Sequence, residues 1–161
     1  GGQGYGSGSS WSRGQAWAIY GFALSYVHTG KKEYLDTAKK VASYFIAQTD
    51  RTEHVALVDF RAPKEPVYWD STAGVCAACG MLEIAKNVPE LEREFYLESA
   101  LKILRATEAK FCNWDPEYDS IVQMGTGAYH SEGDRHVPII YGDYFFIEAI
   151  LRLLDKDFLI W

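Results

Sequence analysis

The sequence lacks any long apolar run, and it carries no excess of basic charge. No stretch reaches the roughly 20 consecutive apolar residues that a membrane-spanning helix requires. No positively charged segment followed by an apolar one opens the sequence, so no secretory signal peptide is recognisable. The formal net charge of −6 argues against nucleic-acid binding, which normally depends on a basic patch. We therefore expect neither a membrane nor a nucleic acid as a partner.

Cysteine is also scarce, and the three residues present cannot form a complete set of disulfides. Cys76 and Cys79 have the spacing of a redox or metal motif, but they lie in a run of small apolar residues at 74–82. No second pair of cysteines or histidines stands at ligand spacing, so a zinc site is not expected. We expect two thiols packed between helices, no metal, no cofactor and a reducing, cytoplasmic location.

Five stretches of the sequence predict helices, and their apolar patterns are of two kinds. Apolar residues occupy nearly every side of the stretches 12–27, 71–86 and 143–154, which predicts helices covered all round. The stretches 32–48 and 89–111 are amphipathic, with one charged face. Inner and outer helices in alternation indicate an all-α fold, an α/α toroid in which one ring of helices wraps another. An independent helical bundle is the structural alternative.

Long loops precede the inner helices, and short extended pieces are expected within them at 67–69 and 121–123. This arrangement places Arg13, Asp70 and Asp143 at the same rim of the toroid, where function is usually found. Both aspartates stand at predicted helix starts, where capping is their first interpretation. Two further carboxylates, Glu132 and Asp134, lie in a polar loop and are expected to be solvated. The residues themselves therefore identify no catalytic group.

The segment from Trp11 to Trp17 is the most informative part of the chain. Ser12 and Gln15 fit a capping box, which makes Arg13 the first helical residue. The unpaired N–H groups of a helix start favour an anion, and a guanidinium can hold a carboxylate by two parallel hydrogen bonds. The two indole rings suit the apolar face of a sugar, so the segment predicts a site for a carboxylated sugar. A structural arginine beside two core tryptophans is the open alternative.

Four segments together resemble the unsaturated glucuronyl hydrolases, glycoside hydrolase family 88. They are Gln3 with WSRGQAWAIYGFALSYVHTG at 11–30, YWDSTA at 68–73, GTGAYH at 125–130 and YGDYFFIEA at 141–149. They occur in the order of that family and span nearly the whole chain. The related unsaturated rhamnogalacturonyl hydrolases are expected to read RGNGW where this chain reads RGQAW at 13–17.

The resemblance implies an (α/α)6 barrel of about twelve helices, of which the five predicted here would form the C-terminal half. Residues 1–161 would then be a single domain, and 1–10 an active-site loop. The implied substrate is an oligosaccharide left by a polysaccharide lyase, with a 4,5-unsaturated uronic acid at its non-reducing end. The implied reaction is hydration of the vinyl ether double bond, with a carboxyl group as general acid.

The resemblance also assigns roles to individual residues. Arg13 would pair with the uronate carboxylate, and Gln3 would hydrogen-bond the sugar. Trp11 and Trp17 would line the sugar-binding cleft. Tyr129 and His130 would lie on the opposing loop. The acid and its assisting aspartate belong to the N-terminal half of the family, and neither motif is present in this sequence.

The absence of those motifs leaves two interpretations. In the first, the chain is part of a glycosidase, is inactive alone, and requires the missing N-terminal half or self-association to cover its inner helices. In the second, the chain is a non-catalytic carbohydrate-binding or assembly fragment of such an enzyme.

Overall fold

A computed structural model describes residues 2–156, and this part of the chain is all-α, as the sequence predicts. Its α-helices are α1 (Ser12–Thr29), α2 (Lys32–Thr49), α3 (Ser71–Lys86), α4 (Glu90–Phe111) and α5 (Ile140–Leu153). Two single-turn 3-10 helices, η1 (Asp50–Thr52) and η2 (Glu132–Asp134), lie in the loops. No strand occurs among these residues, and only isolated β-bridges join the loops. None of the helices found there is long and apolar enough to cross a bilayer.

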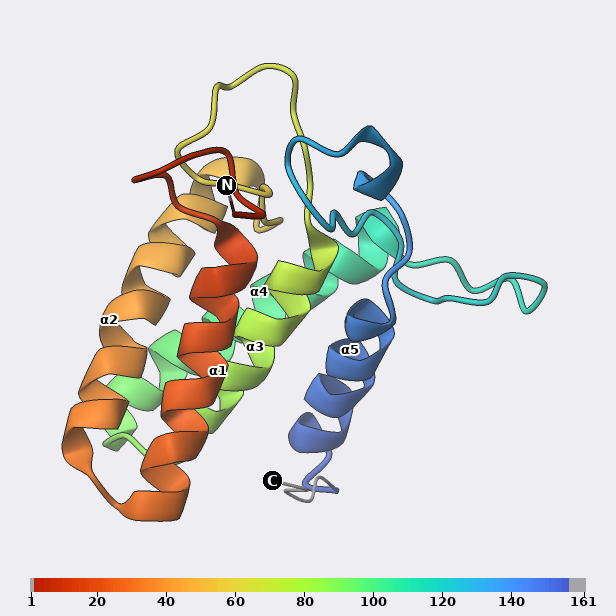
Figure 1. Ribbon diagram of the computed structural model, residues 1–161. Helices are drawn as coiled ribbons and strands as arrows, with labels where there is room; N and C mark the ends of the chain where they lie inside the picture. The colour runs from red at the N-terminus through yellow and green to blue at the C-terminus, as the bar shows by residue number, and fades with distance from the viewer. Residues whose placement is uncertain (1, 157–161) are drawn as a thin grey trace.

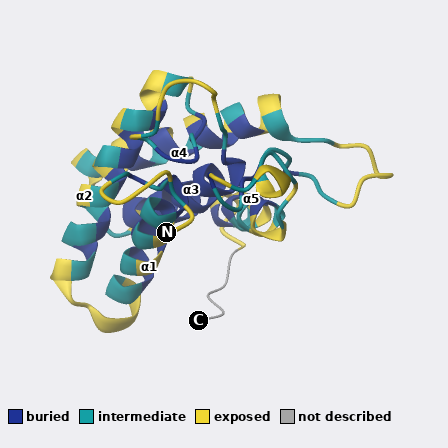
Figure 2. Cartoon of the chain, turned by 45° about the horizontal axis from the view of Figure 1, so that its top comes forward, coloured by how far each residue is buried: buried dark blue, intermediate teal, exposed yellow. Residues whose placement is uncertain are grey.

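Helix α3 is the centre of the fold and packs against the other four α-helices. Every residue from Ser71 to Ala85 is buried, as Figure 2 shows. Small residues permit this close packing: a Cβ on Gly80 would lie 2.7 Å from the backbone nitrogen of Tyr20 on α1. Figure 1 shows α1, α3 and α5 side by side, with α4 behind them. The predicted row of inner helices is therefore confirmed.

The outer helices bury one face each, which confirms their predicted amphipathic character. On α2 the buried residues include Leu35, Ala38, Ala42 and Phe45. On α4 they include Tyr96, Ala100, Ile103 and Leu104. The opposite faces carry charged side chains in solvent, so these helices form the outer layer of a partial toroid.

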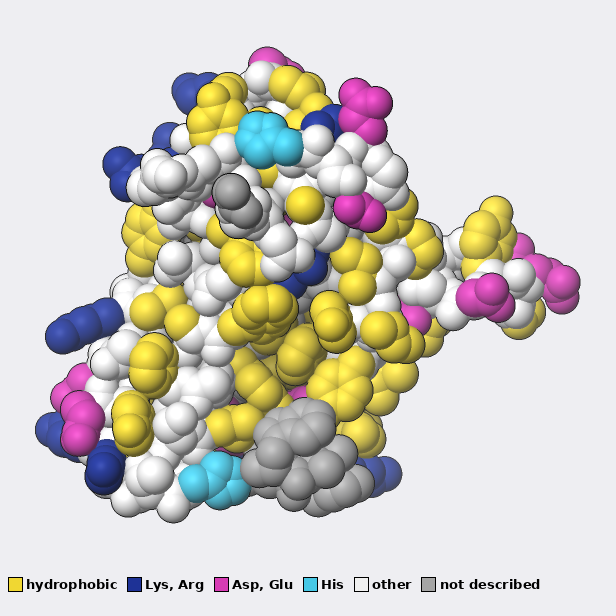
Figure 3. Space-filling view, viewed as in Figure 1, with side chains coloured by type: hydrophobic (Ala, Val, Ile, Leu, Met, Phe, Trp, Pro, Cys, Tyr) yellow, Lys and Arg dark blue, Asp and Glu magenta, His cyan; other side chains and the backbone are white. Residues whose placement is uncertain are grey.

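Helices α1 and α5 each keep an exposed apolar side, as expected for inner helices of half a barrel, although their apolar pattern runs all round. They end the inner row, and only α3 has an inner neighbour on both sides. Trp17 on α1 is 44% exposed, and Ile147 on α5 is 46% exposed. Figure 3 shows hydrophobic side chains gathered over both helices. We call this surface the open apolar face; it also contains Tyr141, Tyr144, Ile150 and Leu153.

The predicted capping arrangements are wrong at three helix starts. Trp11, not Ser12, is the N-cap residue of α1, and the Ser12 hydroxyl donates to the Val58 carbonyl 3.1 Å away. Asp70 precedes α3, but its side chain makes no capping hydrogen bond. Helix α5 begins at Ile140, three residues before the predicted start at Asp143. Ser12 and Asp143 bond to distant loops, and Asp70 bonds to Arg13 on α1, to Thr72 and to Thr126.

Candidate functional site

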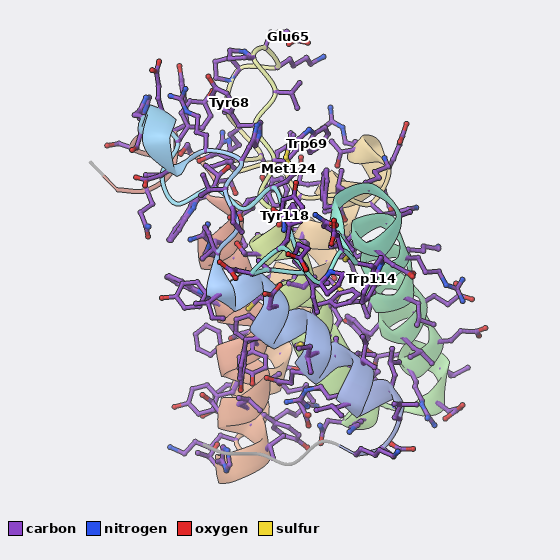
Figure 4. The ribbon with its side chains drawn as sticks, turned by 90° about the vertical axis from the view of Figure 1, so that its right-hand side faces the viewer. Glu65, Tyr68, Trp69, Trp114, Tyr118 and Met124 are labelled. Carbon is purple, nitrogen blue, oxygen red and sulfur yellow. The ribbon has the colours of Figure 1, made fainter. Side chains whose placement is uncertain are left out.

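Three loops, 2–11, 53–70 and 112–139, gather where α1, α3 and α5 begin, and together they form the rim of the fold (Figure 1). Backbone hydrogen bonds join them: the N–H of Ser12 donates to Val58 at 3.0 Å, and that of Ser71 to Met124 at 3.1 Å. Figure 4 shows Tyr68, Trp69 and Met124 brought together at this end of the helices. The predicted extended pieces appear as bridges, Leu57 with Trp69 and Cys112 with Val122.

Arg13 is buried at the centre of the rim and is 3% exposed. Its Nε and Nη2 lie 3.0 and 2.9 Å from Oδ2 of Asp70, and Nη2 also donates to the carbonyl of Thr126. The guanidinium edge predicted to hold a ligand carboxylate therefore engages Asp70. Within residues 2–156 the hydrogen bonds of Arg13 use Nε and Nη2 alone, which leaves Nη1 as the remaining donor group.

Asp70 is fully buried, and several donors surround its carboxylate. Besides Arg13, Oδ1 accepts from the Thr72 hydroxyl and, at 3.3 Å, from the N–H of Thr126. Burial raises the pKa of Asp70, while the Arg13 charge and the hydrogen bonds act in the opposite direction. The ion pair ties α1, α3 and the 123–127 segment into one unit.

Trp11 and Trp17 lie together beside this ion pair. Their rings are in T-shaped contact, with centroids 5.2 Å apart. The Trp11 ring packs on the backbone of Gly14, where a Cβ would lie 2.9 Å from Cε3. The Arg13 guanidinium lies 5.8 Å from the centroid of the Trp11 ring. Trp11 thus lies between the buried cation and the Trp17 ring, which is 44% exposed.

Gln3 and His130 form a second group on the rim, joined to the loop that contains Tyr129. The N–H of Tyr129 donates to the Gln3 carbonyl at 2.9 Å, and Nε2 of Gln3 donates to the Gly127 carbonyl at 2.8 Å. His130 Nε2 lies 2.7 Å from the carbonyl oxygen of Tyr5. Gln3 and His130 are both exposed, so their free polar atoms face solvent.

Tyr129 is a buried member of the rim, 7% exposed, rather than an open surface residue. Its ring lies edge-on to Tyr5 and Tyr68, with centroid separations of 5.1 and 5.2 Å. Burial raises the pKa of its hydroxyl. The ring therefore supports Tyr5, which is 40% exposed and which the sequence analysis did not single out.

Arg135 and His136 were likewise missed, although they bind the loops together. The guanidinium of Arg135 lies 4.3 Å above the Tyr68 ring, and its Nε donates to the Tyr129 carbonyl at 2.8 Å. His136 Nε2 accepts the N–H of Trp69 at 3.0 Å. Burial lowers the pKa of His136, assisted by the charge of Arg135. Their only sequence signal is polarity within a loop, which does not distinguish them from solvated residues.

Three other carboxylates that the sequence analysis named also lie in the rim. Oδ1 of Asp143 accepts from the N–H groups of Ile121 and Val122, at 3.0 and 2.7 Å. Glu132 and Asp134 are exposed. In the part of the chain that the structure describes, no three histidine, cysteine, aspartate or glutamate side chains are placed to hold a metal ion.

Cys76 and Cys79 are buried between the inner helices, as predicted. The Cys79 thiol donates to the Phe145 carbonyl on α5 at 3.1 Å. Burial raises the pKa of Cys76, so its thiol stays protonated and unreactive. Small protonated thiols fit a packing role for these two residues.

No family model matches the chain. Curated relatives do match. The unsaturated glucuronyl hydrolase of Bacillus sp. strain GL1 is 39% identical over 159 residues, which cover 94% of this chain and 41% of that protein. The unsaturated chondroitin disaccharide hydrolase of Streptococcus pneumoniae is 31% identical over 165 residues, covering 99% of this chain and 41% of that protein.

Solved structures agree with these relatives. The crystal structure of the Bacillus sp. GL1 unsaturated glucuronyl hydrolase superimposes with a TM-score of 0.85 and 39% identity, covering 94% of this chain and 41% of that one. A mutant of the Streptococcus agalactiae enzyme, complexed with dGlcA-GalNAc6S, gives a TM-score of 0.87 at 29% identity, covering 99% of this chain and 43% of that one.

The fold and these similarities place the chain in the α/α-barrel class of proteins. It is a homologue of the unsaturated glucuronyl hydrolases, and it spans about two fifths of the length of the curated relatives that it matches. The resemblance noted in the sequence is thereby confirmed for family and fold.

Proposed function

We propose that this chain is the C-terminal half of the barrel of a glycoside hydrolase that acts on 4,5-unsaturated glucuronyl residues of lyase-generated oligosaccharides. The observation that carries the proposal is the 39% identity to an unsaturated glucuronyl hydrolase over 94% of the chain. A structural neighbour complexed with dGlcA-GalNAc6S supports the same substrate class. We call the assembly of this segment with the remaining barrel helices the complete enzyme.

In this proposal the rim of the segment binds the unsaturated sugar. Arg13 faces the uronate carboxylate through Nη1, while Asp70 fixes the other edge of its guanidinium. Trp11 and Trp17 line the apolar side of the ring, and the exposed Gln3 amide hydrogen-bonds a hydroxyl group. Charge-assisted hydrogen bonds in such a partly desolvated site are stronger than those between neutral groups.

The second loop group borders the same site. Tyr129 holds the Tyr5 ring from below, and His130 holds the Tyr5 backbone. We propose that the loop 2–10 is thereby the part of the rim that borders the sugar. The other ring nitrogen of His130, Nδ1, would contribute a polar group to this border.

The general acid belongs, in this proposal, to the helices outside the segment. A carboxyl group there protonates C4 of the vinyl ether, and water adds its oxygen to C5 to give a hemiketal. Opening of the hemiketal breaks the bond between C5 and the ring oxygen, and the resulting hemiacetal at C1 releases the leaving-group sugar as an alcohol. Asp70 is buried by Arg13, and Asp143 is bound by a loop, so neither is available for this step.

The test is hydrolysis of an unsaturated glucuronyl disaccharide by the complete enzyme. The reaction is measured as the loss of the ultraviolet absorbance of the conjugated double bond. We expect Arg13→Ala to lower kcat/KM by about 30-fold or more, because losing a partly buried charged contact costs roughly 2–5 kcal/mol. Trp11→Phe keeps a ring and should lower it far less, and Arg13→Lys should fall between the two. Arg51→Ala, on the exposed η1, is the matched control.

A change of less than about twofold in Arg13→Ala, with the variant still folded, would remove the carboxylate role. No absorbance loss with the wild-type enzyme would remove the proposed activity itself.

The second candidate is a non-catalytic carbohydrate-binding or assembly fragment, and the open apolar face favours it. An exposed apolar patch of this kind marks an interaction surface. One measurement separates the two candidates: a non-catalytic fragment would bind an unsaturated disaccharide and leave its double bond intact, whether or not the other barrel helices are present.

We also propose a cytoplasmic location. Cys76 and Cys112 carry free thiols in the structure. Free thiols fit a reducing compartment. Localisation of a tagged full-length protein tests this.

A further inference from the structure

Asp59 is a buried carboxylate that lies beneath the loop 2–10 and is 2% exposed. Its Oδ2 accepts from the N–H of Tyr5 at 3.1 Å and from the Ser9 hydroxyl at 2.6 Å. Its Oδ1 accepts from the N–H groups of Ser10 and Arg61, at 2.9 and 3.0 Å. Three of these four donors belong to the loop, so one side chain holds the loop at Tyr5, Ser9 and Ser10.

The loop closes tightly over this carboxylate. A Cβ on Gly4 would lie 2.8 Å from Oδ2 of Asp59 and 2.8 Å from Cβ of Trp11. The N–H of Phe60 donates to the Ser10 carbonyl at 2.9 Å, and Trp11 and Asp59 form an antiparallel bridge. Only a glycine at position 4 lets the chain pass this close, and Asp59 holds the middle and the end of the loop.

Gln3 lies between two anchors. On one side Asp59 holds Tyr5, two residues along the chain. On the other side the Gln3 amide donates to Gly127, and the Gln3 carbonyl accepts from Tyr129. Because Gln3 is exposed, its position depends on these hydrogen bonds.

We propose that Asp59 is a positioning residue of the substrate site, which holds Gln3 and Tyr5 at the rim in their binding geometry. The inference rests on the proposed function, in which Gln3 contacts the unsaturated sugar. Asp59 itself is buried and touches no substrate. It acts through the loop, so its removal should matter only while Gln3 is there to be positioned.

A double-mutant cycle in the complete enzyme tests this, with Asp59→Asn, Gln3→Ala and the double variant. Asparagine keeps the shape but places an NH2 group where one oxygen accepted hydrogen bonds. We expect Asp59→Asn to raise KM about tenfold with kcat changed less than about threefold, since ground-state binding is lost. In the Gln3→Ala background the same substitution should raise KM less than about twofold.

Asp143→Asn is the matched control. Asp143 also holds backbone N–H groups of a rim loop, at 121–122, but none of the loop 2–10. Its effect on KM should be the same with and without Gln3.

Amide hydrogen exchange supplies a readout that does not depend on activity. In Asp59→Asn the amides of Tyr5 and Ser10 should exchange about tenfold faster or more, with those of α3 unchanged. Equal effects of Asp59→Asn in both backgrounds would overturn the proposal, as would loss of protection throughout the protein. If the wild-type enzyme hydrolyses the disaccharide while the cycle is additive, the role of Asp59 fails and the proposed function stands. If the wild-type enzyme leaves the disaccharide intact, both fail.

Discussion

The guanidinium of Arg13 and the carboxylate of Asp70 form an ion pair between the first turn of α1 and the residue before α3, with Nε and Oδ2 3.0 Å apart. The two residues are 57 positions apart in the sequence, and both are almost completely buried. The pair therefore joins two inner helices at the rim, and it leaves Nη1 as the donor group of Arg13 that the proposed sugar site would use.

Removing one member of this pair should destabilise the protein strongly. We expect Arg13→Ala and Asp70→Ala each to lower the free energy of unfolding by about 3–5 kcal/mol, because each leaves an unpaired buried charge. Replacing both residues, by Arg13→Met with Asp70→Leu, should cost less than either single change. Urea unfolding of the complete enzyme measures all three. Strictly additive losses would show that the two charges do not depend on each other.

The contact between α1 and α3 at Gly80 should not tolerate a methyl group. We expect Gly80→Ala to cost about 1–3 kcal/mol, because its Cβ would meet the backbone of Tyr20 at 2.7 Å. Gly74→Ala, on the same helix, is the control: its Cβ would lie 3.3 Å from a side-chain methyl of Ile103, which can move. The unfolding temperature of Gly80→Ala should be well below that of Gly74→Ala. The reverse order would contradict this packing.

Cys76 and Cys79 should be replaceable by alanine. Because both are small packing residues, each substitution should lower the free energy of unfolding by about 1–2 kcal/mol or less. The purified protein should hold no metal at this pair. Metal analysis and urea unfolding check both points. Stoichiometric zinc that a chelator removes, with loss of the fold, would contradict the packing role.

His136 should make the rim sensitive to acid. Its folded-state pKa lies below the ordinary value of 6.5, so the unfolded chain takes up a proton first as the pH falls. Stability from this group is complete above pH 6.5 and decreases below it, as protonation of Nε2 breaks the bond from the Trp69 N–H. His136→Asn, which tolerates the φ of 54°, should flatten the acid side of a plot of unfolding temperature against pH. An unchanged acid side would exclude His136 as the cause.

The isolated 161-residue chain should neither turn over substrate nor stay monomeric. Its open apolar face should drive self-association, so light scattering should give a mass above 18.2 kDa. Ile147→Lys places a charge on that face and should return the chain towards the monomer. Robust turnover by a monodisperse wild-type monomer would show that the catalytic acid lies within this chain, with Asp70 and Asp143 the first residues to test.

The sequence by itself predicted the layers of the fold, because helix periodicity and burial are local properties of a chain. The limits of α3 agree with the predicted 71–86, where an all-round apolar run of small residues allows burial on every side. Helix α4 begins directly after Pro89, a residue that favours helix starts. The resemblance carried by four segments together likewise indicated the family.

Only the tertiary structure decided which polar groups meet. The Ser12 hydroxyl bonds to Val58, 46 positions away, so a locally plausible capping box does not form. One edge of the Arg13 guanidinium is engaged by Asp70, and Tyr129 is buried beside Tyr5. Asp59 gave no signal at all, since it stands in a loop without a pattern. A buried charge takes its partner from whatever the folded chain brings within about 3 Å, and that proximity is set by long-range packing, which no local pattern records.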